Sequence, residues 1–138
     1  MPKTQEDQLQ DTGRTVLIVD DEPDVRKVVR MTLEKTGYEV LEAEDGEKAI
    51  AEIKSGENPM LLSLIITDIR MPELDGREFF ELLKATHPQL THRIVFITGD
   101  YLNAGTENFV KETGIPFICK PFSRQELLDV ANRVLAPS

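Results

Sequence analysis

Five short apolar runs recur along this chain of 138 residues, and each is followed by an amphipathic stretch. The runs fit strands that are buried in a sheet, whereas the stretches between them repeat apolar residues at helical spacing. Strands that alternate with helices of this length are joined by right-handed crossovers, which build a parallel sheet covered on both faces. We therefore expect an α/β fold with a doubly wound, five-stranded parallel sheet.

Local signals place the boundaries of these elements. Gly37 is a helix stop, and Asp45 and Asp75 each precede a glycine at a helix start, where a carboxylate can accept hydrogen bonds from free backbone N–H groups. The sequence "SRQE", from Ser123 to Glu126, matches a capping box. The strands are expected at 15–19, 39–43, 64–67, 93–97 and 117–119, and the helices near 24–36, 46–54, 76–86, 106–112 and 124–135.

Composition narrows the classes of function. Residues 1–13 are polar and aperiodic, so we expect a flexible lead-in before a single folded domain at 14–138. The net charge of −9 disfavours direct binding of nucleic acid, whose phosphates require a basic surface. The longest uncharged run, residues 58–67, is too short to span a membrane, and no secretion signal precedes it. Cys119 is the single cysteine, which fits a reducing cytoplasm, and we expect it to pack in the core.

Polar side chains stand at the ends of the expected strands. Asp20 and Asp21 follow the first strand, Asp68 follows the third, Thr98 ends the fourth and Lys120 follows the fifth. In a parallel sheet these groups meet in one crevice, where ligands of such folds bind. The clustered carboxylates repel one another unless a cation joins them, and oxygen ligands of this kind suit Mg²⁺. The lysine and the threonine then suit the oxygens of a phosphoryl group.

Taken together, "VDDE", "DIRMPELDG", "FITGD" and "KPF", in this order and spacing, resemble the receiver domain of bacterial response regulators. The resemblance covers about residues 14–136. It implies a flavodoxin-like strand order of 2-1-3-4-5 and a cytoplasmic signalling domain. Asp68 would accept a phosphoryl group from a sensor histidine kinase or a phosphotransfer protein, and the domain would later dephosphorylate itself.

The same resemblance implies a role for each residue at the strand ends. Asp21 and Asp68 would bind Mg²⁺ directly, together with the backbone carbonyl of Arg70, while Asp20 would act mainly through water. The chemistry agrees, because formation of an aspartyl phosphate needs a carboxylate nucleophile and a metal that neutralises charge on the phosphoryl oxygens.

The resemblance also implies a route from the site to a partner. Thr98 and Lys120 would bind the phosphoryl group, with Thr98 turning inward on activation, and Phe117 would occupy the aromatic switch position. The peptide bond from Lys120 to Pro121 would be cis. The face formed by the fourth helix, the fifth strand and the last helix would contact a downstream protein. Arg70 and Asp100 would flank the path of the hydrolytic water, and a salt bridge between them would modulate the lifetime of the phosphoryl group.

Other interpretations compete with this one. A Mg²⁺-dependent phosphohydrolase with an aspartyl nucleophile needs a second acid two residues later, where this chain has Arg70. A flavodoxin-like cofactor module would be repelled by the acids after the first strand. A degenerate receiver that binds a partner without phosphorylation stays open, although all five key side chains are present. Asp21 can also serve as a helix cap, and Phe117 as a core residue. The chain stops directly after the last helix, so output is expected through a protein contact or from a larger protein of which this is a part.

Overall fold

A computed structural model describes residues 14–56, 61–71, 73–99 and 103–135, and the expected lead-in at 1–13 lies outside them. Five strands in these residues form one sheet, in which every neighbouring pair is parallel and the order is β2-β1-β3-β4-β5. This confirms the predicted doubly wound α/β fold and its strand order. The strands are β1 (Thr15–Val19), β2 (Glu39–Ala43), β3 (Leu62–Asp68), β4 (Ile94–Thr98) and β5 (Phe117–Cys119).

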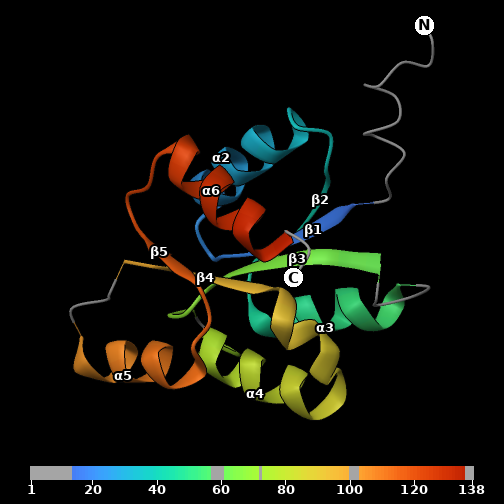
Figure 1. The fold of residues 1–138 in the computed structure, drawn as a ribbon. Helices are drawn as coiled ribbons and strands as arrows, with labels where there is room; N and C mark the ends of the chain where they lie inside the picture. Colours follow the sequence, from blue (N-terminus) through green and yellow to red (C-terminus); the bar gives the residue numbers. More distant parts are fainter. Residues whose placement is uncertain (1–13, 57–60, 72, 100–102, 136–138) are drawn as a thin grey trace, which may run out of the picture.

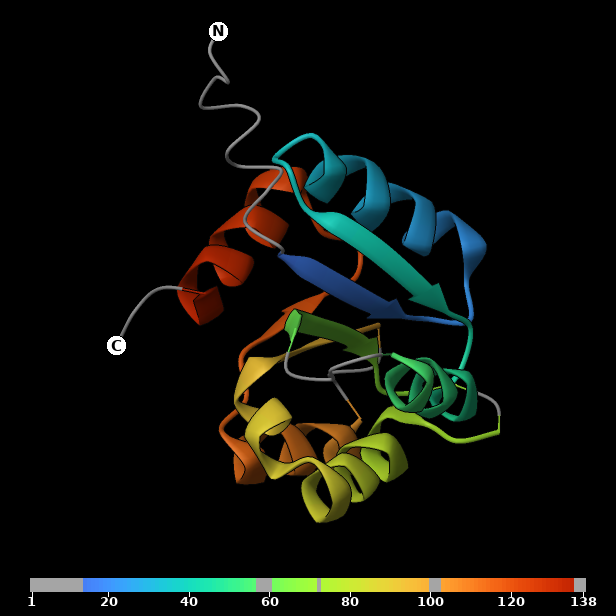
Figure 2. The same cartoon turned by 90° about the vertical axis from the view of Figure 1, so that its right-hand side faces the viewer.

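The helices lie in two layers, one on each face of the sheet. Figure 1 shows α2 and α6 on one face and α3, α4 and α5 on the other, and Figure 2 shows the same layers from the side. No helix in the described part of the chain is both long and apolar enough to cross a membrane. The helices are α2 (Pro23–Glu34), α3 (Gly46–Ser55), α4 (Gly76–Thr86), α5 (Ala104–Thr113) and α6 (Arg124–Leu135), with a short 3-10 helix, η2 (Pro88–Arg93).

Each face of the sheet packs against its own hydrophobic cluster. Successive side chains of a strand point to opposite faces, so Val16 and Ile18 of β1 pack on the side of α2 and α6, whereas Leu17 and Val19 pack on the side of α3, α4 and α5. All four side chains are fully buried. Because β1, β3 and β4 are covered on both faces, their carboxyl ends have fixed positions, and these ends carry the candidate site.

The predicted helix caps are present. Asp45 accepts a hydrogen bond from the backbone N–H of Lys48, and Asp75 forms a reciprocal capping box with Glu78. The predicted capping box before α6 is confirmed as well. The Glu126 N–H donates to Ser123 Oγ at 3.0 Å, and the Ser123 N–H donates to Glu126 Oε1 at 2.8 Å. These caps fix where α3, α4 and α6 leave the edge of the sheet.

Several element boundaries and the burial of one residue differ from the prediction, and α2 ends at Glu34, two residues earlier than expected. β3 is longer at both ends and includes Asp68, and β4 begins at Ile94 because residues 88–93 form η2. Helix α5 begins at Ala104 because Asn103 caps it, accepting hydrogen bonds from two backbone N–H groups. Cys119 is exposed rather than packed in the core, because it is the last residue of a three-residue strand at the edge of the sheet.

Gly76, the first residue of α4, lies against the backbone of the strand end that carries Asp68. Its N–H donates to the carbonyl oxygen of Ile69 at 2.8 Å. A Cβ atom at this position would lie 2.2 Å from the carbonyl oxygen of Asp68 and 2.7 Å from Cα of Ile69. Only glycine therefore allows α4 to begin this close to the end of β3.

We predict that Gly76→Ala lowers the free energy of unfolding by about 1–3 kcal/mol, because the added methyl group forces rigid backbone apart. Gly56→Ala is the matched control, since its Cβ atom would meet only ordinary contacts at 3.6 Å. Chemical denaturation followed by circular dichroism gives both values. Equal stability of the two variants would show that the contact at Gly76 is not tight.

Candidate functional site

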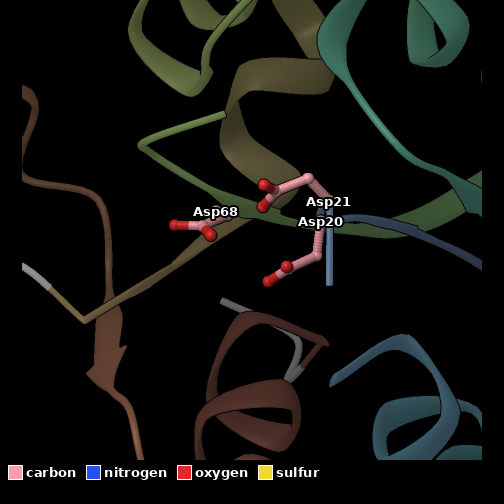
Figure 3. A group of neighbouring side chains, drawn as sticks. All are labelled: Asp20, Asp21 and Asp68. Carbon is pink, nitrogen blue, oxygen red and sulfur yellow. The ribbon is translucent and has the colours of Figure 1, made fainter. Parts of the chain in front are cut away.

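The carboxyl ends of β1 and β3 bring three aspartates together. Val19 and Thr67 are partners in the parallel register, so Asp20 follows β1 beside Asp68, the last residue of β3. Figure 3 shows the carboxylates of Asp20, Asp21 and Asp68 gathered at these two strand ends. One oxygen atom from each lies within 4.8 Å of the others. The structure thus places side by side the three acids that the sequence predicted to meet.

The three carboxylates differ in their exposure to solvent. Asp20 is fully buried and Asp68 is 5% exposed, whereas Asp21 is exposed. Burial raises the pKa of the Asp20 carboxyl to about 6, and the Asp68 charge adds to this, against a hydrogen bond from the Glu22 N–H. Burial also raises the pKa of Asp68, which Lys120 partly offsets. Both pKa values are raised because burial makes the ionised carboxylates unfavourable, and a bound cation would make them less so.

Lys120 lies among the acids. Its Nζ atom lies 2.9 Å from Asp68 Oδ2, 3.0 Å from Asp20 Oδ2 and 2.5 Å from Glu22 Oε1. Burial lowers the pKa of this ammonium group, but the carboxylates of Glu22, Asp68 and Asp20 together raise it above its usual value. Lys120 therefore carries a positive charge at neutral pH. The peptide bond from Lys120 to Pro121 is cis, as the resemblance implied.

The buried oxygen Asp20 Oδ2 is incompletely satisfied. Its partner among the residues that the structure describes is the Lys120 ammonium group at 3.0 Å, which Asp68 and Glu22 share. The other oxygen of Asp20 accepts the Glu22 N–H at 2.8 Å. A buried carboxylate oxygen that shares its cation with two other acids favours a bound water or a further cation beside it.

The Asp68 carboxylate is held in one orientation. Its Oδ1 atom accepts hydrogen bonds from the backbone N–H groups of Ile69 at 2.7 Å and Arg70 at 3.3 Å, and its Oδ2 atom accepts one from Lys120. These bonds fix the direction of the carboxylate from both sides. The backbone carbonyl of Arg70, expected as a metal ligand, belongs to the same short segment.

Thr98 lies on β4, the neighbour of β3, and Phe117 lies on β5, one strand further out in the sheet. Thr98 is fully buried at the end of β4, and its carbonyl oxygen accepts a hydrogen bond from the Lys120 N–H at 2.8 Å. Phe117 is half-buried on β5, pairs in register with Phe96 and packs against the cluster on the side of α5. Asp100, the expected partner of Arg70, lies outside the described residues, so that pair stays a prediction.

Sequence reasoning missed the role of Glu22. This residue is the N-cap of α2, yet its side chain makes no cap and pairs with Lys120 instead. The two residues are 98 positions apart, so no local pattern connects them. Asp21, which we considered as a cap, does not occupy the N-cap position.

The set of ligands fits a small divalent cation. When all are ionised, the four carboxylates of Asp20, Asp21, Glu22 and Asp68 outnumber the single ammonium of Lys120 by three charges. Carboxylate oxygens of this density suit hard cations such as Mg²⁺, which binds one or two carboxylates and retains several waters. The exposure of Asp21 leaves the site open to solvent.

Comparisons with known proteins agree with this geometry. The family described as the response regulator receiver domain matches residues 16–132. Over 120 residues the chain is 35% identical to the nitrogen assimilation regulatory protein NtrX of Azorhizobium caulinodans, and over 123 residues it is 33% identical to the sensor kinase CckA of Brucella abortus. These alignments cover 87% and 88% of the chain but only 26% and 12% of those longer proteins. The response regulator receiver protein CpdR of Brucella abortus is 31% identical and is covered over 97% of its length.

Solved structures show the same likeness. The chemotaxis protein CheY4 of Vibrio cholerae matches with a TM-score of 0.75 at 31% identity, covering 88% of this chain and 98% of that one. The receiver domain of NtrX from Brucella abortus matches with a TM-score of 0.75 at 33% identity, covering 89% of this chain and 99% of that one. With the family match over most of its length, the parallel sheet and the acids at its carboxyl edge, the chain belongs to the response regulator receiver domains of two-component systems.

Proposed function

We propose that this receiver domain accepts a phosphoryl group on the carboxylate of Asp68. The observation that carries the proposal is the position of Lys120 Nζ, 2.9 Å from Asp68 Oδ2 and next to the cluster of three aspartates. A nucleophilic carboxylate thus has a fixed cation on one side and a set of metal ligands on the other. Phosphoryl transfer depends mainly on such positioning and charge neutralisation.

The donor in this proposal is a phosphohistidine on a sensor histidine kinase or a phosphotransfer protein. As the bond from an Asp68 oxygen to phosphorus forms, the bond from phosphorus to the histidine nitrogen breaks, and that nitrogen takes a proton from solvent. Hydrolysis later breaks the aspartyl phosphate, with a water molecule supplying the oxygen of the released phosphate. Receiver domains are regulatory signalling domains, and catalysis here is limited to the domain's own phosphorylation and dephosphorylation.

Each residue of the site has its own role in this proposal. The backbone N–H groups of Ile69 and Arg70 orient the Asp68 carboxylate. Lys120, which binds Asp68 before the reaction, moves its contact to a phosphoryl oxygen afterwards. Asp20, Asp21, Asp68 and the Arg70 carbonyl are the proposed ligands of Mg²⁺. When bound, Mg²⁺ supplies positive charge to the phosphoryl oxygens.

The signal leaves the site through β4 and β5. Thr98 is one strand away from Asp68, and we propose that its hydroxyl turns toward the phosphoryl group while Phe117 changes its packing. The face made by α5, β5 and α6 then presents an altered surface to a downstream protein. A cytoplasmic place for this exchange is part of the same proposal, since sensor kinases transfer phosphoryl groups there.

Asp68→Asn tests the acceptor directly. We expect this variant to take up no phosphoryl group from acetyl phosphate or a kinase, because the amide keeps the shape but is not a nucleophile. Circular dichroism checks the fold, and labelling is read by intact-protein mass. Asp24→Asn, an exposed acid on α2, is the control and is expected to label normally. Undiminished labelling of Asp68→Asn would overturn the assignment, and no labelling of the unsubstituted protein would favour the phosphorylation-independent receiver.

Mg²⁺ is expected to raise the melting temperature, because a ligand that binds only the folded state stabilises it, by about 1.4 kcal/mol at ten times the Kd. Asp21→Ala is expected to reduce this gain and to raise the melting temperature of the metal-free protein, because it removes one of several like charges. Thermal denaturation with and without Mg²⁺ measures both effects. A metal-free variant that melts below the unsubstituted protein would contradict the like-charge argument.

The lifetime of the phosphoryl group tests the proposed pair of Arg70 and Asp100. We expect Arg70→Ala to change the rate of autodephosphorylation several-fold, toward faster decay, while Mg²⁺ affinity stays nearly constant because only the backbone at position 70 is a proposed ligand. Decay is measured in the two alanine variants and in the double variant. Simple additivity of the two single effects would show that the residues do not act as a pair.

A further inference from the structure

A second charged cluster lies next to the acid site, between α2 and β2. Arg26 and Arg30 lie one turn apart on α2, and both bind the carboxylate of Glu42 on β2. Arg26 Nε lies 2.8 Å from Glu42 Oε1, and Arg30 Nε lies 2.6 Å from Glu42 Oε2. Burial raises the pKa of Glu42, but the two arginines together hold it below its usual value. Glu42 is therefore an ionised anchor that both guanidinium groups share.

Arg26 makes one contact that Arg30 does not. Its Nη1 atom donates a hydrogen bond to the carbonyl oxygen of Asp20 at 2.6 Å. The N–H of Asp20 donates to the carbonyl oxygen of Ala43 at 3.1 Å, and its carboxylate accepts the N–H of Glu22. The backbone where β1 passes into α2 is thus fixed by three hydrogen bonds. Arg26 supplies the one that holds the peptide group between Asp20 and Asp21.

We propose that Arg26 is a positioning residue for the metal site. By holding the carbonyl oxygen of Asp20, it sets the orientation of the following peptide group and hence the direction of the Asp21 carboxylate. The inference rests on the proposed function, since it assigns Arg26 to the same Mg²⁺ site. Residues that orient metal ligands without touching the metal commonly change metal affinity about 10-fold or more when substituted.

The two contacts of Arg26 require a guanidinium group. Its Nε atom binds Glu42 while Nη1 binds the Asp20 carbonyl, so one planar group spans β2 and the end of β1. The ammonium group of a lysine is a single point of charge and does not reproduce two donors at fixed separation. Arg26→Lys therefore keeps the charge and removes the geometry.

If Arg26 acted through its charge alone, replacing it would change Mg²⁺ affinity in the opposite direction from the change that a positioning role predicts. A positive charge near a cation site weakens cation binding, so the loss of any nearby arginine should strengthen Mg²⁺ binding through charge alone. Loss of positioning should weaken it. Arg30 is the matched control, because it binds Glu42 and Glu34 but does not contact Asp20.

The experiment is a calorimetric titration of Mg²⁺ into the full chain and three variants. We expect Arg26→Lys and Arg26→Gln to bind Mg²⁺ about 10-fold more weakly, and Arg30→Gln to bind at least as tightly as the unsubstituted protein. The rate of labelling by acetyl phosphate should fall in both Arg26 variants at limiting Mg²⁺. It should return to the unsubstituted rate when Mg²⁺ saturates the site, which a general loss of structure would not allow.

Each result has a defined meaning. Unchanged or tighter Mg²⁺ binding by Arg26→Lys, or equal weakening by Arg30→Gln, would overturn the inference and leave the proposed function intact. Unfolding of both Arg26 variants would also overturn it, by making Arg26 a residue of the fold alone. Failure of the unsubstituted protein to bind Mg²⁺ would remove the proposed function and this inference together.

Discussion

The ammonium group of Lys120 binds the carboxylates of Asp20, Glu22 and Asp68, and so connects the end of β5 to the ends of β1 and β3. Two of these acids are buried, and burial of an unpaired charge is strongly unfavourable. Lys120 reduces the repulsion among these acids but does not neutralise their charge, because Asp21 lies beside Asp20 and Asp68. The remaining negative charge suits a divalent cation, and in the proposed function the same lysine binds a phosphoryl oxygen. Stability and chemistry therefore depend on one ion-pair cluster.

The backbone behind these side chains is fixed on two sides. On the side of β3, the close approach of Gly76 to Ile69 sets the start of α4 and the path of the chain after Asp68. On the side of β1, Arg26 holds the carbonyl oxygen of Asp20 from α2. Neither contact involves an atom that would touch a phosphoryl group. Both limit the freedom of the segments that carry the acids, and a site formed by short strand ends needs such support.

The sequence predicted those features that depend on local pattern or on general rules of parallel sheets. The caps at Asp45 and Asp75 are local, and the meeting of Asp20, Asp68 and Lys120 follows from the rule that the carboxyl ends of parallel strands share one edge. Contacts between residues far apart in the sequence, such as that of Glu22 with Lys120, were not predicted. A glutamate before a helix has the same local pattern whether or not it binds a distant lysine. The exposure of Cys119 was missed for a related reason. Apolar alternation does not reveal that a strand lies at the edge of a sheet. The switch roles of Thr98 and Phe117 remain predictions because they concern the phosphorylated state. The pair of Arg70 and Asp100 remains a prediction because Asp100 lies outside the described residues.

The site draws its groups from segments that are far apart in the chain. Lys120 is 52 positions from Asp68 and 98 from Glu22, and it follows β5, a strand of three residues that pairs with β4 alone. A chain in which β5 has not docked retains the acids at the ends of β1 and β3 but has no lysine among them. The proposed chemistry therefore requires that β5, the last strand of the sheet, is in place. Conversely, any ligand that engages Lys120 favours the docked strand by mass action. Binding at the site and docking of β5 are therefore thermodynamically coupled.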